Sequence, residues 1–537
     1  MQHKIGIIDL GSNTSRLIIM AYTPGVTFQL IDQLRERVRL SEGMGAENIL
    51  RPEPMERTIR LLKVFRQLCE ANGIDTIVAT ATSAARDARN QAEFLERVRT
   101  EAGLDLRILS GAEEAYYGYL GAVNSLPIQN GMVVDIGGGS LELARVQDRQ
   151  LAQTASLPLG AVRLTETFIK NDPPKSLDLR VIDRYIDAML GSIDWLKAGS
   201  GGMLVGLGGT ARTLAKIDQE RRHYPLDRLH GYTISLTSIE NILHELEQLP
   251  LSKREKVPGL SADRADVIIS GAIALTRLMH QGGYHEMTIC GQGLREGLFY
   301  EQFLKDSGTA LVPDVRAFGL ANLTYLYNIN WPHARHVQQL ALSMFDQLRS
   351  LHGCGPLERA ILSGAALLHD VGVAIDFYDH DQHSYYLILN AELPGFSHRE
   401  VAMMALLAKY HRHGLPTVDT FHGLLTQADV DRVRKLSALL RLAEYLERGR
   451  TQVIQSITCR VRGKVVNLIA HTRGDATMEM WAANQNTDLF KQVFRHDLVI
   501  RLEPLTDRDL SSTPIEPAGS ADAEPLWSRV RELIEQK

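Results

Sequence analysis

Short apolar runs that end in turn residues alternate with helix-like segments over the first half of the chain. Two segments, residues 5–15 and 132–142, repeat one pattern: an apolar run, an aspartate, a Gly/Ser-rich turn and a second apolar run. Apolar runs on either side of such a turn predict two strands joined by a tight turn. Because each copy lies near the start of a region of similar size, the pattern predicts a duplicated α/β unit.

Further elements of both regions follow from the same signals. Residues 76–79 predict a buried strand, residues 83–99 a helix with Ser83 as N-cap, and residues 106–109 a short strand followed by a helix. Residues 202–212 and 287–297 each have the form strand, glycine turn, helix. We therefore expect two α/β domains, over residues 1–125 and 126–308.

The pattern of apolar and polar residues changes after Gly308. From residue 309 to about 450 the apolar positions follow helical periodicity and histidines are frequent. From about residue 451 strand-like runs return, and Gly463-Lys464 between two of them predicts a hairpin. Residues 511–525 predict a linker and residues 526–536 a short closing helix. These patterns predict an all-α domain over residues 309–450 and a small α+β domain over residues 451–537.

Composition narrows the class of protein. The chain has 537 residues, a net charge of -5 and an ordinary 44% of hydrophobic residues, so it has no overall basic field that would attract nucleic acid or an anionic membrane. Its four cysteines are scattered without a CxxC pair, which fits a reducing cytoplasm. No signal peptide precedes the first strand, and no apolar run approaches the ~20 residues that span a bilayer. We expect a cytoplasmic protein without membrane or nucleic-acid partners.

The glycine-rich turns carry the first candidate chemistry. Glycine lets the backbone approach a ligand closely and present N–H groups to phosphate oxygens. The turn Gly208-Gly209-Thr210 opens a predicted helix, whose first N–H groups form an anion site. The aspartate that leads each hairpin, Asp9 or Asp135, can hold a metal ion, often through water. One such turn is ordinary in a loop, but three together favour phosphate chemistry.

Two adjacent glutamates begin the helix that follows residue 109. Ser110 to Glu113 fits the S-x-x-E capping box, in which Glu113 reaches back to the Ser110 backbone. Glu114 has no such role and is the candidate general base that takes a proton from an attacking water; alternatively it only stabilises the helix N-terminus. Arg86 suits bidentate phosphate binding, although an ordinary exposed helical arginine is the simpler interpretation.

Taken together, these segments resemble the exopolyphosphatase/guanosine pentaphosphate phosphatase family, which belongs to the actin-like (ASKHA, ribonuclease H-like) superfold. The stretches that carry the resemblance are residues 8–14, 81–86, 110–115, 134–142, 208–210 and 293–297. Their order and spacing match over residues 1–305, and a further match from residues 368–370 to 410–411 covers the helical region of the long form.

The resemblance implies a role for each matching residue. It assigns Glu114 as catalytic base and places Asp135 and Glu142 near Mg²⁺ and the attacking water. Mg²⁺ is the expected cofactor, with Mn²⁺ and K⁺ as further candidates. Phosphoryl transfer requires charge neutralisation and a positioned water more than covalent help. The residues expected around the phosphates are Ser12, Asn13, Arg86, Gly138, Gly139, Ser140, Gly208, Gly209 and Thr210.

The histidine-rich helical region resembles the HD phosphohydrolase fold. Such sites pair a His-Asp dipeptide, here His369-Asp370, with outlying ligands on other helices. The resemblance implies a second metal site formed by His333, His369, Asp370, His411 and Glu444. Glutamate replaces the usual final aspartate and reaches one methylene further. The alternative is a degenerate domain that serves as scaffold or dimer surface.

The predicted function is Mg²⁺-dependent hydrolysis of terminal phosphate from inorganic polyphosphate by a base-activated water. The alternative is guanosine pentaphosphate 5′-phosphohydrolase activity with the same machinery, and a third hypothesis is an actin-like kinase or ATPase. A homodimer is expected. Three basic clusters, at residues 35–39, 221–223 and 253–256, are interpreted as solvated surface unless one of them lines a groove that leads to the cleft.

Overall fold

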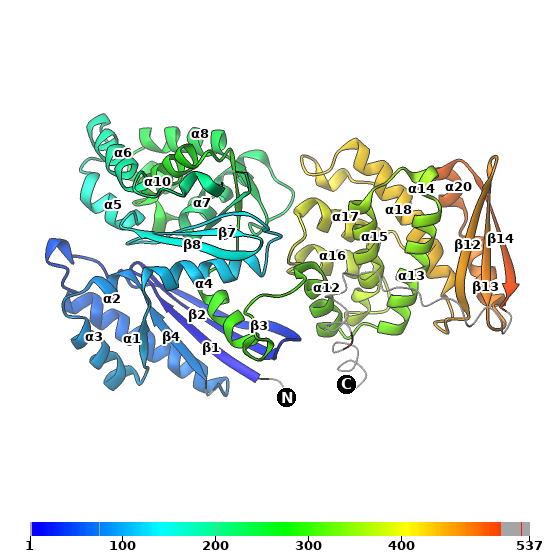
Figure 1. Cartoon of the computed structure of the whole chain (residues 1–537), viewed down its shortest axis with the longest axis horizontal. Helices are drawn as coiled ribbons and strands as arrows, with labels where there is room; N and C mark the ends of the chain where they lie inside the picture. Colours follow the sequence, from blue (N-terminus) through cyan, green and yellow to red (C-terminus); the bar gives the residue numbers. More distant parts are fainter. Residues whose placement is uncertain (1–2, 75, 200, 506–527, 529–537) are drawn as a thin grey trace. The chain divides into compact units, whose positions relative to one another are not determined.

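The structure, a computed structural model, describes residues 3–505 except 75 and 200, together with Ser528 (Figure 1). It divides the chain into two compact units, Met1–Val312 and Pro313–Lys537. The division into four domains remains a prediction. The predicted linker at residues 511–525 lies outside the described residues, and so does the predicted closing helix at residues 526–536 apart from Ser528.

Unit 1 contains two sheets, and the first has the strand order β3-β2-β1-β4-β5. Strands β1 to β3 form an antiparallel meander, whereas β4 runs parallel to β1 and β5 parallel to β4. The elements are β1 His3–Leu10, β2 Thr14–Thr23, β3 Thr27–Arg37, α1 Pro52–Ala71, β4 Ile77–Ala81, α2 Ser83–Asp87, α3 Gln91–Arg97, β5 Leu106–Ile108 and α4 Gly111–Val123.

The second sheet of unit 1 has the order β10-β11-β9-β6-β7-β8. Its strands β6 to β8 again form an antiparallel meander, and β9 joins β6 in parallel. The elements are β6 Gly131–Ile136, β7 Leu141–Gln147, β8 Gln150–Leu157, α5 Ala161–Phe168, α6 Ser176–Leu190, β9 Met203–Leu207, α7 Gly208–Arg222, β10 Thr233–Ser235, α8 Leu236–Gln248, α9 Leu251–Arg254, α10 Ile268–Gly282, β11 Glu286–Ile289 and α11 Leu294–Phe303. The first four strands of both sheets share order and direction, which confirms the predicted duplication and agrees with the actin-like expectation.

The two predicted hairpins match in register as well as in sequence. Both turns close with one backbone bond of the same kind, from Gly11 N to Thr14 O at 3.1 Å and from Gly137 N to Ser140 O at 3.0 Å. Asp9 lies opposite Arg16 in the first hairpin, and Asp135 lies opposite Glu142 in the second. The duplicated backbone therefore presents a carboxylate and a guanidinium in one copy and two carboxylates in the other.

One predicted helix proved wrong in its extent and its cap. Residues 83–99 form α2 and α3 with a break at residues 88–90, not one helix, and Thr82 rather than Ser83 precedes the first turn. Tertiary hydrogen bonds explain the break. The amide oxygen of Asn90 accepts from Leu50 N at 2.9 Å, and Arg89 N donates to Asn48 O at 2.8 Å.

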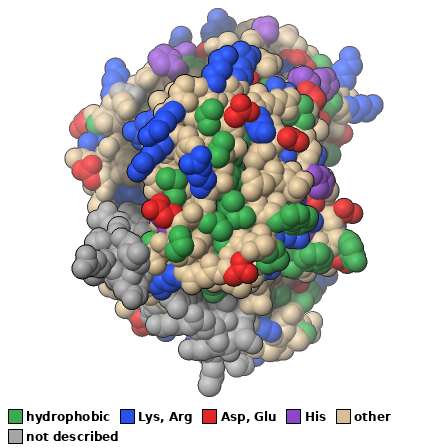
Figure 2. All heavy atoms as spheres, turned by 90° about the vertical axis from the view of Figure 1, so that its right-hand side faces the viewer, with side chains coloured by type: hydrophobic (Ala, Val, Ile, Leu, Met, Phe, Trp, Pro, Cys, Tyr) green, Lys and Arg blue, Asp and Glu red, His purple; other side chains and the backbone are tan. Residues whose placement is uncertain are grey.

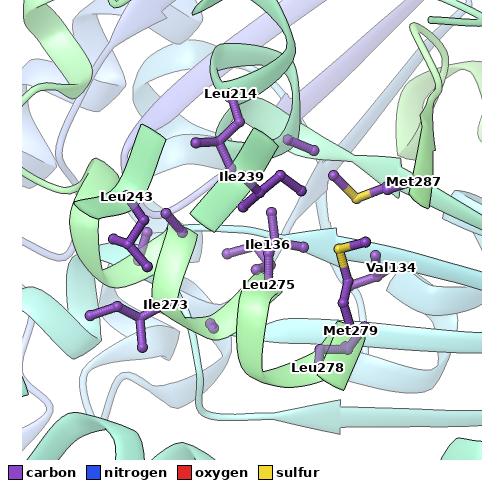
Figure 3. Packing of buried hydrophobic residues seen from close by; sticks show 14 of the residues in the cluster. Val134, Ile136, Leu214, Ile239, Leu243, Ile273, Leu275, Leu278, Met279 and Met287 are labelled. Carbon is purple, nitrogen blue, oxygen red and sulfur yellow. The ribbon is translucent and has the colours of Figure 1, made fainter. Parts of the chain in front are cut away.

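The core of the second sheet lies between its strands and the helices of its outer face. Ile136 of β6 lies beside Leu275 of α10 and Val134 beside Met279 of the same helix, while Leu214 and Ile239 join the layer from α7 and α8 (Figure 3). All of these side chains are almost fully buried. This apolar layer fixes β6, and with it the position of the hairpin that Asp135 opens.

Helices α4 and α11 each pack on the sheet to which they do not belong in sequence. α4 follows the first sheet in sequence yet packs on β6, β7 and β8, whereas α11 follows the second sheet and packs on β1 and β2. The two helices also pack on each other, closely enough that a Cβ at Gly297 would lie 2.0 Å from Tyr117 O. α4 therefore lies between the two sheets, with its first turn at the cleft (Figure 1).

Unit 2 begins with a helical region, as the periodicity predicted. Its helices are α12 Val315–Leu326, α13 Trp331–Gln347, α14 Arg349–His352, α15 Pro356–Leu368, α16 His380–Asn390, α17 His398–Lys409 and α18 Gln427–Leu446. α13 packs against α15 and α18, and α17 against α15, α16 and α18. The resemblance of this region to the HD fold stays a prediction.

The remainder of unit 2 is a three-stranded sheet with two helices. These elements are β12 Ile454–Arg462, β13 Val465–Thr472, α19 Thr477–Gln485, α20 Asp488–Phe494 and β14 Asp497–Pro504. The predicted hairpin at Gly463-Lys464 joins β12 and β13. Figure 2 looks onto this end of unit 2 and shows basic and hydrophobic side chains mixed on the surface. In the sheet, Arg460, Val499 and Arg501 are exposed. None of the helices within residues 3–505 combines the length and apolar character that crossing a membrane requires.

Candidate active site

The two hairpins, the start of α4 and the start of α7 meet around a cavity of about 120 Å³ in unit 1. Its lining includes most of the residues that the sequence nominated. Those present are Ser12, Asn13, Glu114, Asp135, Gly138, Ser140, Glu142, Gly208 and Gly209. Tertiary structure therefore brings together segments that lie up to 200 residues apart in the chain.

Glu113 takes the capping role that the sequence predicted, and Glu114 does not. Glu113 completes the capping box of α4: its carboxylate accepts from Ser110 N at 2.8 Å, and its own N–H donates to Ser110 Oγ at 3.2 Å. Glu114 instead turns inward, with 9% of its surface exposed, and lines the cavity. Of the two adjacent carboxylates, only Glu114 can meet a molecule bound in the cleft.

Arg86 lies beside Glu114 and outside the cavity lining. Its guanidinium donates to the Glu114 carboxylate and, at 2.9 Å, to Leu109 O. The neighbouring Asp87 is bound by Arg163 at 2.6 Å. The structure thus places the predicted phosphate-binding arginine as the partner of the candidate base, where it orients that carboxylate.

Burial shapes the ionisation of the acids in the cleft. It raises the pKa of Glu114 to about 7, against the opposing charge of Arg86. Burial also raises the pKa values of Asp9, Asp135 and Glu142, and the charge of Glu114 raises that of Glu142 further. A carboxyl group with a pKa near neutrality is suited to accept a proton from water.

Asp135 and Glu142 fit a divalent cation. They lie opposite each other on β6 and β7, and both line the cavity. Two neighbouring carboxylates are hard oxygen donors of the type that Mg²⁺ binds, and their mutual repulsion is relieved by a cation. Asp9, at the equivalent place in the first hairpin, already faces Arg16.

The start of α7 supplies the anion-binding turn. Gly208 has φ +77°, and with Gly209 it lines the cavity, so the first N–H groups of a 15-residue helix lie at its wall. Thr210 is 2% exposed and packs against Gly271 of α10, outside the cavity lining. Gly139 lies against Ser83 and lines an adjoining pocket of about 450 Å³, together with Ser12 and Gly138.

Gly160 is a site residue that the sequence analysis did not nominate. It precedes α5, whose first N–H groups bind the second hairpin: Ala161 N donates to Gly137 O and Val162 N to Gly138 O, both at 3.0 Å. A Cβ at position 160 would lie 2.3 Å from the carbonyl carbon of Gly139. The only sequence signal was a glycine directly before a helix.

Gly160→Ala is expected to displace the Gly138-Gly139 loop, because a Cβ cannot approach backbone atoms that closely. The variant should lose about 1–3 kcal/mol of folding free energy and show a raised KM for its phosphate substrate. Urea unfolding and steady-state kinetics measure both effects. Gly201→Ala is the control, since nothing lies within 4 Å of the added methyl group; an unchanged KM in Gly160→Ala would contradict the expectation.

A basic pocket of about 260 Å³ adjoins the cavity and shares Arg16, Gly209 and Arg264 with it. Its cationic lining residues are Arg16, Arg35, Arg212, Lys216, Arg264 and Arg295. Burial and the charges of Arg212 and Arg295 lower the pKa of Arg16 to about 9, and burial lowers that of Arg264 to about 10. Crowded, half-desolvated cations of this kind attract a polyanion.

Sequence reasoning found only one part of this pocket. Arg35, from the basic cluster at residues 35–39, lines it and pairs with Asp263 at 2.7 Å, whereas Arg37 and Arg39 pair with Asp266. The other five cations come from four separate segments, with Arg212 and Lys216 both on α7. No local sequence pattern predicts that these cations line one pocket, because only the tertiary fold brings them together.

In unit 2, the five residues of the predicted second metal site also come together. His333, His369, Asp370, His411 and Glu444 are all buried, and Glu444 Oε2 lies 3.1 Å from Nε2 of both His333 and His369. The longer glutamate side chain therefore reaches the cluster. His380, which the sequence analysis did not include in the site, lies 3.2 Å from Asp370 Oδ1.

Two glycine-rich hairpins, a buried acid and an adjoining basic pocket fit an α/β enzyme that acts on phosphates. Comparison with known proteins gives the family. The model of the Ppx/GppA phosphatase family matches residues 18–306, and that of domain III of Ppx/GppA phosphatases matches residues 315–473. The chain belongs to the Ppx/GppA phosphatase family.

Solved structures agree with this assignment for unit 1. The crystal structure of the Aquifex aeolicus member of the Ppx/GppA family is similar with a TM-score of 0.51 and 29% identity, over 57% of this chain and 100% of that chain. The fold also matches that of an exopolyphosphatase from Cytophaga hutchinsonii, with a TM-score of 0.52 and 24% identity, over 58% of this chain and 100% of that chain.

Proposed function

We propose that this protein is an exopolyphosphatase that removes the terminal phosphate of inorganic polyphosphate by direct attack of water. The observation that carries the proposal is the position of Glu114. Its carboxylate is buried, oriented by Arg86 and placed in the cavity where the two phosphate-binding hairpins meet. A kinase, which transfers the phosphoryl group to an acceptor other than water, has no need of a general base aimed at water at this position.

In the proposed reaction, the oxygen of a water molecule forms a bond to the terminal phosphorus. The bond from that phosphorus to the bridging oxygen breaks, and Glu114 takes the proton of the water. Backbone N–H groups of the hairpins and of the first turn of α7 bind the phosphate oxygens, while Arg16 and Arg264 neutralise the charge that develops. No covalent intermediate on the protein is required.

Asp135 and Glu142 are the residues that would hold Mg²⁺. When bound, the cation neutralises phosphate oxygens and polarises the phosphorus toward attack. The side-by-side carboxylates support this assignment, and the Asp9–Arg16 pair supports a phosphate-binding rather than metal-binding role for the first hairpin.

The basic pocket supports a chain of phosphates as substrate. Six cationic side chains line it, and it opens from the cavity through Arg16 and Arg264, so a polyphosphate can occupy it while its terminal unit lies near Glu114. The described lining residues of the cavity and of its two adjoining pockets include no aromatic side chain on which a guanine could stack. This favours polyphosphate over guanosine pentaphosphate.

Phosphate release from long-chain polyphosphate and from guanosine pentaphosphate, measured side by side with and without Mg²⁺, tests the proposal. We expect a higher kcat/KM for polyphosphate, and Mg²⁺ dependence with both substrates. A preference for guanosine pentaphosphate would assign the alternative function. ATP turnover faster than either reaction would overturn the phosphatase mechanism.

The pH dependence of kcat/KM gives an independent check of Glu114. A general base works only when deprotonated, so a raised pKa of about 7 places an acid limb there: activity should fall as pH drops through neutrality. Arg86 lowers this pKa by charge and hydrogen bond, so Arg86→Met should move the limb to higher pH. The control Arg107→Met removes the equivalent partner of Glu113 and should leave the limb in place. A limb that stays unmoved in Arg86→Met would contradict the assignment.

A further inference from the structure

The clustered histidines of unit 2 lie around one carboxylate. Asp370 follows α15 directly, and four histidines from α13, the end of α15, α16 and the end of α17 surround it. Nε2 of His380 lies 3.2 Å from Asp370 Oδ1, and Nε2 of His369 and of His411 each lie 3.6 Å from the same oxygen. Asp370 Oδ2 lies 3.8 Å from His333 Nε2.

These separations fit shared metal ions better than hydrogen bonds. N–H···O bonds in proteins span about 2.7–3.2 Å, so a separation of 3.6–3.8 Å is too long. Ligands that bind one cation at 2.0–2.2 Å lie about 2.8–3.6 Å apart in octahedral or tetrahedral arrangements. Five of the six separations in this cluster, at 3.1–3.6 Å, fall within that range, and the sixth, from His333 Nε2 to Asp370 Oδ2, is 3.8 Å.

Backbone carbonyls fix three of the imidazole rings with Nε2 toward Asp370. Nδ1 of His369 donates to Ala366 O at 2.7 Å, Nδ1 of His380 to Phe377 O at 2.8 Å, and Nδ1 of His411 to Ala408 O at 2.6 Å. Because a carbonyl oxygen can only accept, each Nδ1 carries a proton, and Nε2 is the nitrogen left to bind a cation. Protein metal centres hold their histidines in this way.

Several polar atoms of the cluster are buried without a hydrogen bond. Among the described residues, His411 Nε2, Asp370 Oδ1 and both ring nitrogens of His333 have no hydrogen-bond partner. His333 and His411 are 2% and 0% exposed. An unpartnered buried polar group costs about 1–3 kcal/mol. Three of these atoms, Nε2 of His333, Nε2 of His411 and Oδ1 of Asp370, lie in the cluster and are explained by cations that they bind.

We propose that unit 2 holds a dinuclear metal centre in which Asp370 bridges two divalent cations. His333, His369 and Glu444 complete one site, and His380 and His411 complete the other. The two groups of atoms that lie close enough to hold an ion share Asp370 and no other residue. Sequence reasoning had predicted one site without His380. The structure divides the cluster in two.

The types of ligand atom in the cluster indicate which cations it would bind. Four imidazoles with two carboxylates suit Zn²⁺, Fe²⁺, Mn²⁺ or Co²⁺, whereas Mg²⁺ prefers oxygen donors such as those of the cleft in unit 1. Arg450 donates to Asp370 Oδ2 at 2.7 Å and its side chain is 38% exposed, so the cluster reaches solvent on that side. Binding of the cations would share or displace this contact.

Co²⁺ binding to the full chain tests the proposal. The chelator-treated protein is dialysed against Co²⁺ in excess Mg²⁺, which occupies the oxygen site, and Co²⁺ per chain is measured by mass spectrometry together with the visible absorption of the ion. We expect two Co²⁺ in the wild type and one in His333→Gln, in His411→Gln and in His380→Gln. His380→Gln changes the first residue of α16 and leaves the rest of that helix unaltered.

His336→Gln is the matched control. This histidine lies one turn from His333 on α13, is equally buried, and binds Ile454 O at 2.7 Å instead of facing Asp370. It should retain both Co²⁺ ions. A wild type that binds fewer than two, a His380→Gln variant that retains two, or the loss of both ions from a single-site variant with wild-type circular dichroism would each overturn the proposal.

Discussion

Glu114→Gln is expected to lower kcat for phosphate release by about 10²–10⁴-fold, with a much smaller change in KM. The substitution keeps the size and hydrogen-bonding capacity of the side chain and removes only its ability to take a proton. In the proposed mechanism, phosphate binding depends on the hairpins, α7 and the basic pocket, and not on Glu114. Steady-state kinetics with polyphosphate at saturating Mg²⁺ measure both parameters.

The neighbouring glutamate is the matched control for this experiment. Glu113→Gln removes a carboxylate one residue away whose pKa is held at about 2 by the backbone N–H of Ser110 and by Arg107. It should weaken the capping of α4 and leave kcat within a few-fold of wild type. Equal losses of kcat in the two variants would mean that the start of α4 is merely structural, and retained activity in Glu114→Gln would remove the proposed base.

The second large effect is expected from Asp135→Asn. Loss of one of two carboxylates at a hard-cation site should raise the Mg²⁺ concentration for half-maximal activity at least tenfold and lower kcat by about 10²-fold or more, since a catalytic cation supplies several kcal/mol of charge stabilisation. Activity measured over a Mg²⁺ titration separates weaker Mg²⁺ binding from a lower kcat. Excess Mg²⁺ fills the site in the variant, so any loss of activity that remains at saturation is a loss of kcat.

Asp9→Asn, in the first hairpin, is the control for Asp135→Asn. Asp9 occupies the equivalent position, but it faces Arg16 where Asp135 faces Glu142. Asp9→Asn should therefore shift the Mg²⁺ requirement far less than Asp135→Asn. If the two variants shift it equally, the hairpins share the cation and the asymmetry between them is not functional.

The predictions that succeeded share a local cause. A Gly/Ser turn between two apolar runs leaves few folds open to the backbone, so both hairpins were predicted at their positions, and their equal register followed from equal turn length. The capping box of Ser110 and Glu113 is likewise complete within four residues. Because Glu113 is used there, the sequence could nominate Glu114 by local reasoning alone.

The predictions that failed or fell short depended on partners distant in the chain. The helix at residues 83–99 is broken by bonds from residues 89 and 90 to residues 48 and 50, which no helical periodicity reveals. The pairing of Arg86 with Glu114 was not predicted, because α2 and α4 are separate segments of the chain; its place at the phosphates stays a prediction. Gly160 is required to be glycine only because the Gly138-Gly139 loop packs against it, and that loop is distant in sequence from any local signal at residue 160.

By itself, the sequence determined the two glycine-rich hairpins of the duplicated α/β unit and the capping box that sets Glu113 apart from Glu114, since each of these consists of contiguous residues with a fixed local geometry. Only the tertiary structure decided what those residues face: the exchange of α4 and α11 that carries Glu114 between the sheets, the cations gathered from separate segments into one pocket, and the placement of His380 on Asp370. Charges and ligands act over a few ångströms in space, and distance along the chain does not fix that spacing.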